Sequence, residues 1–174
     1  MGRLTEGSNP SPSAPRASIR PVDDHEAMGF ALEEAAAAPL HGDVPVGAVV
    51  VGPEGELLAS RHNERELAAD PTAHAEVLAL RDAAAALGTW RLTGCTLVVT
   101  LEPCTMCAGA AVSARLDRVV FATPDPKAGA TGSLYNICAD PRLNWEPAVV
   151  PGVRADEAKA LLTAFFTGVR SRPQ

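Results

Sequence analysis

The 174-residue chain is predicted to be an α/β protein in which a mixed sheet lies between helices on both faces. Apolar, β-branched runs alternate with Ala-rich helical segments along most of the sequence. One of these runs, residues 96–101 (TLVVTL), is apolar almost throughout, which is typical of a strand buried on both faces. Hydrophobic residues make up 47% of the chain and charged residues 21%, as in one ordinary globular domain.

The first half begins with a segment that is excluded from the fold. Residues 1–21 are rich in Pro and Ser and nearly free of large apolar side chains, so they are expected to be disordered. The domain is then expected to span residues 22–172. Its first helix runs from Asp23 to about residue 39, and Asp23 or Asp24 caps its start. Strands at 45–51 and 56–61 pair as an antiparallel hairpin across the turn at 52–55, and Gly47 indicates close approach by another backbone or a ligand.

The second half carries the remaining helices and strands. Asp70 is a good N-cap and Pro71 fits a first helical position, so a helix is predicted from Pro71 to about residue 87, where Gly88 ends it. Pro103 is expected to start the next helix after the buried strand. The other predicted elements are a strand at 118–122, a short helical piece at 134–138, a strand at 149–153 and a helix at 156–170.

A set of metal donors is shared between two segments. His74 stands in DPTAHAE (70–76), and Cys104 and Cys107 stand in EPCTMC (102–107). One imidazole and two thiolates make a three-ligand zinc set, and no second His or third Cys lies near either segment, so a fourth position stays open for water. Glu76 is placed to handle the protons of that water. A C-x-x-C pair is also found in redox proteins, and some zinc sites are purely structural, but the nearby His and Glu favour a catalytic zinc ion.

The spacing of His74 and Glu76 constrains where the zinc ion lies. Residues i and i+2 of a helix do not face the same way, so both serve one ion only if it lies over the start of the helix. The two cysteines are also expected at a helix N-terminus, which stabilises thiolates. Two helix N-termini are therefore expected to converge on the metal.

Other features limit the classes of function. A net charge of −6 argues against indiscriminate nucleic-acid binding, so any RNA contacts must come from a local basic patch. There is no apolar signal-peptide core and no run of about 20 apolar residues, so a cytoplasmic location is expected. Cys95 and Cys138 are interpreted as buried thiols, and His25, His41 and His62 are assigned no role. Phe165 and Phe166 are adjacent and point differently, which predicts that at least one lies in the core.

The motif His-x-Glu followed by Pro-Cys-x-x-Cys matches the known signature of zinc nucleobase deaminases. Further blocks match as well: VPVGAVVV, DPTAHAEVLALR, TLVVTLEPCTMCAGA, RVVFA and GATGSLYN. From about residue 26 to residue 170 the chain resembles the bacterial tRNA adenosine deaminases of the cytidine deaminase-like superfamily. Two positions depart from the family pattern, with Ala69 where relatives can carry His and Pro124 where the family often has Arg.

The resemblance implies a three-layer α/β/α fold with a five-stranded mixed sheet, a homodimer and one Zn²⁺ per subunit. It also implies conversion of adenosine to inosine at the wobble position of a tRNA anticodon, with an arginine tRNA (ACG) as substrate. By motif, it assigns zinc binding to His74, Cys104 and Cys107, and proton transfer to Glu76. Substrate contacts carried over in the same way are Asn63 on the flipped base, Val46 and Ala75 at the pocket, and Asp125, Lys127 and Phe166 along the anticodon groove.

Two competing functions stay open. Pocket shape sets the choice of base, so a deaminase of guanine, cytosine or a free nucleoside would carry the same zinc motif. A non-catalytic zinc protein that binds RNA as a partner subunit is the other alternative. Such a protein would be expected to lack the proton shuttle, whereas Glu76 is present.

Overall fold

The computed structural model describes residues 20–171, so nearly all of the tail predicted at 1–21 lies outside the described residues. A five-stranded sheet has the strand order β2-β1-β3-β4-β5. Strand β1 is antiparallel to both of its neighbours, whereas β3, β4 and β5 are parallel, so the sheet is mixed as predicted. The strands are β1 (Gly47–Val51), β2 (Leu57–His62), β3 (Thr96–Leu101), β4 (Arg118–Thr123) and β5 (Ala148–Pro151).

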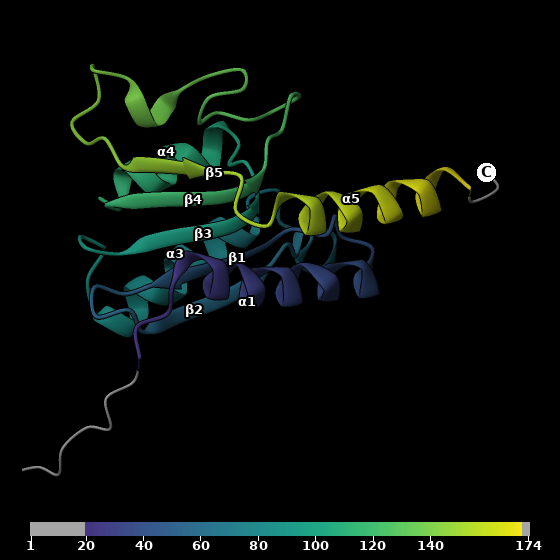
Figure 1. Ribbon diagram of the computed structural model, residues 1–174, viewed down its shortest axis with the longest axis horizontal. Helices are drawn as coiled ribbons and strands as arrows, with labels where there is room; N and C mark the ends of the chain where they lie inside the picture. Colours follow the sequence, from purple (N-terminus) through teal and green to yellow (C-terminus); the bar gives the residue numbers. More distant parts are fainter. Residues whose placement is uncertain (1–19, 172–174) are drawn as a thin grey trace, which may run out of the picture.

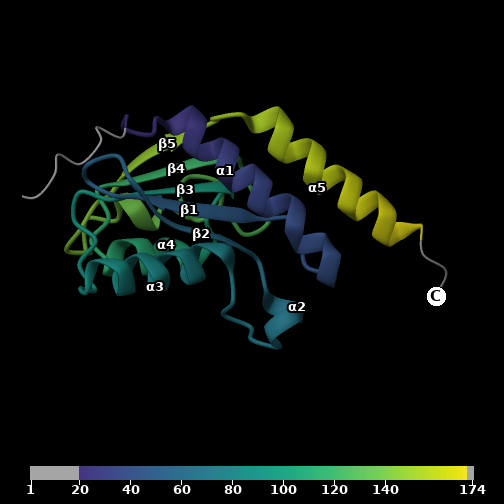
Figure 2. The same ribbon diagram turned by 90° about the horizontal axis from the view of Figure 1, so that it is seen from below.

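Helices cover both faces of this sheet, which confirms the predicted three-layer architecture (Figures 1 and 2). Figure 2 shows α1 and α5 on one side and α3 and α4 on the other. The four long helices are α1 (Asp24–Ala37), α3 (Ala75–Leu87), α4 (Thr105–Ser113) and α5 (Ala155–Arg170). Short helical segments are η1 (Ala38–His41), α2 (Arg65–Ala68) and η2 (Ile137–Ala139). No helix within residues 20–171 has the length and apolar character needed to cross a bilayer.

Each face of the sheet has its own core because successive strand residues point to opposite faces. Val49, Val98 and Val120 pack with residues of α1 and α5. Val50, Leu97 and Val119 belong to the larger core on the other face, beneath α3. The central strands are therefore apolar on both faces, as the run at 96–101 predicted.

The backbone of α1 lies close to the sheet at Gly47. A Cβ atom at this position would lie 2.0 Å from the carbonyl oxygen of Ala31 and 2.5 Å from the backbone nitrogen of Ala35. The sequence predicted close approach to Gly47 by either another backbone or a ligand, and the structure shows the backbone of α1 there.

The start of α3 corrects the sequence prediction. The helix begins at Ala75 with His74 as its N-cap, four residues later than predicted. Asp70 instead accepts hydrogen bonds from the backbone nitrogen and the hydroxyl of Thr72, at 2.7 and 2.8 Å. This Asx turn uses the same side-chain acceptor that would otherwise cap a helix. Pro103 likewise does not start α4, which begins at Thr105 with Cys104 as its N-cap. Two other helix ends agree with prediction, because Asp23 caps α1 and Gly88 ends α3 at φ 66°.

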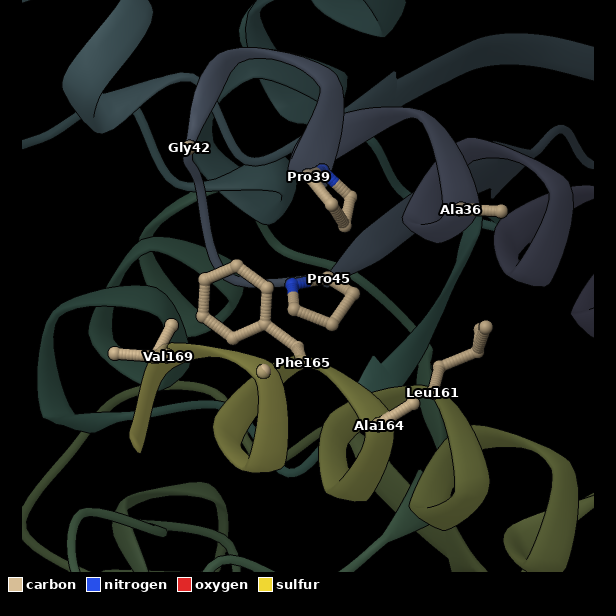
Figure 3. Close-up of a pocket in the computed structure, with 9 residues that line it drawn as sticks. Ala36, Pro39, Gly42, Pro45, Leu161, Ala164, Phe165 and Val169 are labelled. Atoms are coloured by element: carbon tan, nitrogen blue, oxygen red, sulfur yellow. The ribbon is translucent and has the colours of Figure 1, made fainter. Parts of the chain in front are cut away.

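Helix α5 lies beside α1 and the turn that follows it, and an apolar pocket opens between them (Figure 3). Phe165 points from α5 toward Pro39 and Pro45 across this pocket. Phe165 is half-buried and Phe166 is 45% exposed, so the expectation that one of the two rings lies in the core was wrong. Ala158 and Leu161 make the contacts of α5 with the core, and the aromatic residues lie beyond them toward the end of the helix.

Candidate active site

His74, Cys104 and Cys107 come together at one point, as the zinc motif requires. Nδ1 of His74 lies 3.8 Å from Sγ of Cys104 and 3.5 Å from Sγ of Cys107, and the two sulfurs are 3.7 Å apart. Tetrahedral zinc with Zn–S of about 2.3 Å and Zn–N of about 2.0–2.1 Å would separate two sulfurs by about 3.8 Å and sulfur from nitrogen by about 3.5 Å. The three donors therefore fit one Zn²⁺ ion. Within residues 20–171 no other group of three His, Cys, Asp or Glu side chains is close enough to share a metal.

Two helix N-termini converge on these donors. His74 is the N-cap of α3, and Cys104 is the N-cap of α4, which also carries Cys107 in its first turn. The partial positive charge of the two helix ends favours thiolates and other anions here. The hydrogen bond between the sulfur atoms of Cys104 and Cys107 lowers the pKa of Cys104 to about 3, and the hydrogen bond with Cys104 raises the pKa of His74.

Glu76 lies beside the donors in a cavity of about 160 Å³. Residues two apart inside a helix would face different ways, but His74 is the N-cap of α3 and Glu76 is its second residue. Both side chains can therefore serve one metal ion that lies over the helix start. The Glu76 side chain is 4% exposed, and this burial raises the pKa of its carboxyl above its ordinary value. A carboxyl with a raised pKa is suited to accept and return a proton near neutral pH.

The cavity also contains three of the six residues predicted to contact substrate. Val46, Asn63 and Asp125 line it together with His74, Glu76 and Cys104. Sequence reasoning did not find the remaining lining residues, which are Val44, Arg65, Leu101, Glu102 and Ala128.

Three of the predicted substrate residues lie elsewhere. Lys127 and Phe166 line a neighbouring hollow between the 123–127 loop and α5. Ala75 is fully buried in the core beneath the cavity, so its side chain is not available to a substrate. The match to a family motif identified a position in each case but not which way the side chain faces.

Asn63 is held by hydrogen bonds on two sides. Its backbone nitrogen donates to the carbonyl of Val46 at 2.9 Å, and its side-chain amide donates to Asp43 at 3.4 Å. Asp43 is 1% exposed and also accepts from the backbone nitrogens of Glu66 and Leu67. Burial alone would raise the pKa of Asp43, but these hydrogen bonds outweigh it and hold the pKa below its ordinary value. The buried carboxylate thus positions Asn63 at the cavity.

Glu102, which also lines the cavity, holds the loop at residues 125–133 in place. The side chain is 2% exposed and accepts hydrogen bonds from the backbone nitrogens of Asp125, Thr131 and Ser133 at 3.0, 3.1 and 3.0 Å. The hydroxyls of Thr131 and Ser133 donate to it as well. One carboxylate therefore ties residues 125–133 to the segment that leads into Cys104. The only sequence signal for this role is an acidic residue directly after a buried strand.

The replacement Glu102→Gln is expected to destabilise the fold by about 1.5–3 kcal/mol, because a neutral amide accepts fewer and weaker hydrogen bonds than a carboxylate. Hydrogen bonds from Ser133, Asp125 and Thr131 outweigh the effect of burial and hold the pKa of Glu102 below its ordinary value of 4.5. The carboxylate therefore stabilises the fold above pH 4.5, and this contribution is lost as the pH falls through the lower, folded-state pKa.

Chemical denaturation across this pH range, compared with the exposed replacement Glu146→Gln, measures both effects. Equal stability of the two variants at pH 7, or identical acid profiles for wild type and Glu102→Gln, would contradict the assignment.

Comparison with known proteins agrees with this geometry. Residues 21–123 match the cytidine and deoxycytidylate deaminase zinc-binding region. The chain is 48% identical to the tRNA-specific adenosine deaminase of Bacillus subtilis over 151 residues, 87% of this chain and 93% of that protein. It is 43% identical to the enzyme of the same name from Haemophilus influenzae, over 86% of this chain and 87% of that protein.

Solved structures point the same way. A structure from studies of A-to-I editing by tRNA:A34 deaminases at the wobble position of transfer RNA is 41% identical, with a TM-score of 0.76 over 78% of this chain and 98% of that one. The guanine deaminase of Nitrosomonas europaea is 28% identical, with a TM-score of 0.70 over 82% of this chain and 84% of that one. The chain thus belongs to the tRNA-specific adenosine deaminase family, within the proteins that share the cytidine and deoxycytidylate deaminase zinc-binding region.

Proposed function

We propose that this protein converts adenosine to inosine at the wobble position of a tRNA anticodon, with an arginine tRNA of anticodon ACG as the substrate. The observation that carries the reaction is that Glu76 shares a cavity with His74 and Cys104, which lie together with Cys107 as a complete set of zinc donors. The choice of adenosine in tRNA over a free base rests on relatives at 43–48% identity that carry this name and align with 86–87% of this chain. Two guanine deaminases are less similar, at 28% identity over 82% of this chain and 38% identity over only 56% of it.

The reaction is hydrolysis at C6 of the adenine ring. A C6–O bond forms with water, the C6–N6 bond breaks, and ammonia leaves. When bound by His74, Cys104 and Cys107, zinc supplies a Lewis acid that lowers the pKa of water from about 15.7 to about 7. Glu76 takes a proton from the attacking water and delivers it to the ring nitrogen beside C6. It then takes the remaining proton of the new hydroxyl group on C6 and passes it to the departing amine, which leaves as ammonia. One buried carboxyl group thus serves as general base and then as general acid.

Substrate contacts are proposed for residues around and beside the cavity. Asn63 and Val46 hold the flipped base, and Asp125 lies on the facing loop. Lys127 and Phe166 line the neighbouring hollow, where they contact the anticodon loop. Lys159 and Arg170 line the same hollow, so it offers the local basic patch that a chain of net charge −6 needs to bind RNA.

We further propose that residues 22–172 act as one deaminase domain, that two chains form a homodimer, and that the enzyme works in the cytoplasm, where a tRNA substrate is found. Support for the dimer comes from the small-residue face of α4, where a Cβ atom on Gly109 would meet nothing within 4 Å. Trp90, on the same side of the sheet, is 57% exposed. Sedimentation of a monomer at micromolar concentration would contradict the dimer.

The test is inosine formation in an arginine tRNA anticodon stem-loop, measured beside free adenosine, guanine and cytosine. A matched stem-loop with guanosine at the wobble position serves as the control. Inosine at the wobble position only would support the proposal. If guanine or cytosine were turned over while the stem-loop stayed unchanged, the substrate would be a free base and not a tRNA. If zinc-loaded protein turned over none of these substrates, the non-catalytic alternative would replace deamination.

The replacement Asn63→Ala is expected to lower kcat/KM for the stem-loop about tenfold, since the loss of one hydrogen bond of about 1.4 kcal/mol corresponds to that factor. Asn144→Ala, at an exposed asparagine outside the cavity, is the matched control. Zinc content and melting temperature would show whether the site stays intact. An unchanged kcat/KM in an intact Asn63→Ala protein would remove Asn63 from the proposed contacts.

A further inference from the structure

Two histidines to which the sequence assigned no role face each other outside the zinc cavity. His41 ends η1 and His62 ends β2, and their Nε2 atoms are 3.2 Å apart. The ring centroids are 5.2 Å apart and the ring planes are tilted by 30°, so the rings meet through their Nε2 edges and are not stacked face to face. Three elements meet at this point, because His62 of β2 also contacts Glu34 of α1, the helix directly before η1.

Each ring has a carboxylate on its other nitrogen. Oε2 of Glu34 lies 2.7 Å from Nδ1 of His62, and Oδ2 of Asp43 lies 3.2 Å from Nδ1 of His41. An ionised carboxylate only accepts hydrogen bonds, so each Nδ1 carries the proton and donates it. In two neutral rings, both Nε2 atoms are then left with lone pairs that face each other. Two acceptors do not hydrogen-bond, so either a proton or a metal cation lies between them.

We propose that His41 and His62 bind one divalent transition-metal ion through their Nε2 atoms, at a site distinct from the catalytic zinc site. Metal–nitrogen distances of about 2.0–2.1 Å at a tetrahedral angle place two ligand nitrogens about 3.3–3.4 Å apart, close to the 3.2 Å found here. Carboxylates that accept from Nδ1 are the usual outer partners of metal-bound histidines. Imidazole nitrogen suits Zn²⁺, Ni²⁺ and Cu²⁺.

Charge and access are consistent with such an ion. The carboxylates of Glu34 and Asp43 give the cluster a formal charge of −2 when both rings are neutral. The side chains of His41 and His62 are 21% and 20% exposed, which leaves room for water to complete the coordination. Through Asp43 the site adjoins the hydrogen bonds that hold Asn63 and the backbone of residues 66 and 67.

The experiment uses tag-free, full-length protein that already holds one zinc ion per chain, dialysed against micromolar NiCl₂. Nickel is the probe because the thiolates of the catalytic site retain zinc. We expect about one nickel ion per chain in addition to the zinc, measured by elemental analysis and by calorimetric titration. His41→Gln and His62→Gln are each expected to lose the nickel and keep the zinc. Glu34→Gln keeps both rings and is expected to bind nickel about 10–100-fold more weakly.

His25→Gln, at a histidine of α1 outside the pair, is the matched control and is expected to bind nickel as the wild type does. Thermal melting would show whether the histidine variants fold, and Glu34→Gln tests the site even if they do not. Absence of nickel beyond the zinc in the wild type would overturn the proposal, since the two rings would then share only a proton. Undiminished nickel binding in the folded histidine variants would overturn it as well.

Discussion

Replacing Glu76 by Gln is expected to slow inosine formation by about 10²–10⁴-fold while the protein keeps its zinc, because the amide neither accepts nor returns a proton. The amide has the shape of the carboxyl group, so the cavity keeps its form. Since burial disfavours the charged carboxylate, the neutral amide is expected to leave the melting temperature unchanged or to raise it. Single-turnover rates on the anticodon stem-loop, with zinc content and melting curves for each protein, measure these effects.

The control for this variant is Glu54→Gln, which makes the same chemical change in an exposed turn. We expect Glu54→Gln to match the wild type in rate. A Glu76→Gln protein that holds zinc and retains more than a tenth of the wild-type rate would contradict the proposed proton transfer. Such a result would not affect the assignment of the metal site, but it would mean that another group transfers the proton.

Replacing Cys107 by Ser is expected to abolish zinc binding and activity together. Cys107 is fully buried in the first turn of α4, and a hydroxyl is a poor ligand for zinc beside the remaining thiolate and imidazole. The wild type gains stability from bound zinc, about 4 kcal/mol when free zinc is 1,000 times its dissociation constant, and the variant is expected to lack this gain. Elemental analysis and melting curves with and without added zinc give the two readouts.

Cys138→Ala is the matched control, because Cys138 is also a buried cysteine but packs in an apolar cluster with Ala108 and Val112 of α4. This variant is expected to keep one zinc ion per chain and a zinc-dependent melting temperature. Removing zinc from the wild type with a chelator is expected to abolish activity, and adding zinc back is expected to restore it. Full zinc occupancy in Cys107→Ser would show that Cys107 is not a ligand.

The fold was largely predictable because its elements have strong local signals. Continuous apolar runs predicted β1, β3 and β4, and the caps at Asp23 and Gly88 set helix ends that the structure confirms. The start of α3 was not predictable in the same way, because Asp70 has two uses for one side chain. A cap and an Asx turn need the same acceptor, and only the surrounding backbone selects between them.

Some parts of the site were predictable from the sequence and others were not. Donor types and the spacing of Cys104 and Cys107 identified a zinc site before any geometry was known. Glu102 carries no comparable signal, because its partners at 125–133 are more than 20 residues away and are mostly backbone nitrogens. The family motif likewise named Ala75 and Phe166 without showing that one is buried and the other lies beside a neighbouring hollow.

By itself the sequence determined the element types, the metal-binding chemistry and the family, because each depends on residue types at short, fixed spacings. Only the tertiary structure decided which residues from distant parts of the chain lie next to each other. It brought His74 to a cysteine pair 30 residues away, and it set His62 against His41 across 21 residues. The physical reason is that contacts between distant segments depend on helix-to-sheet packing and strand order. Helix packing and strand order are set by the whole core, so they produce no pattern in a short stretch of sequence.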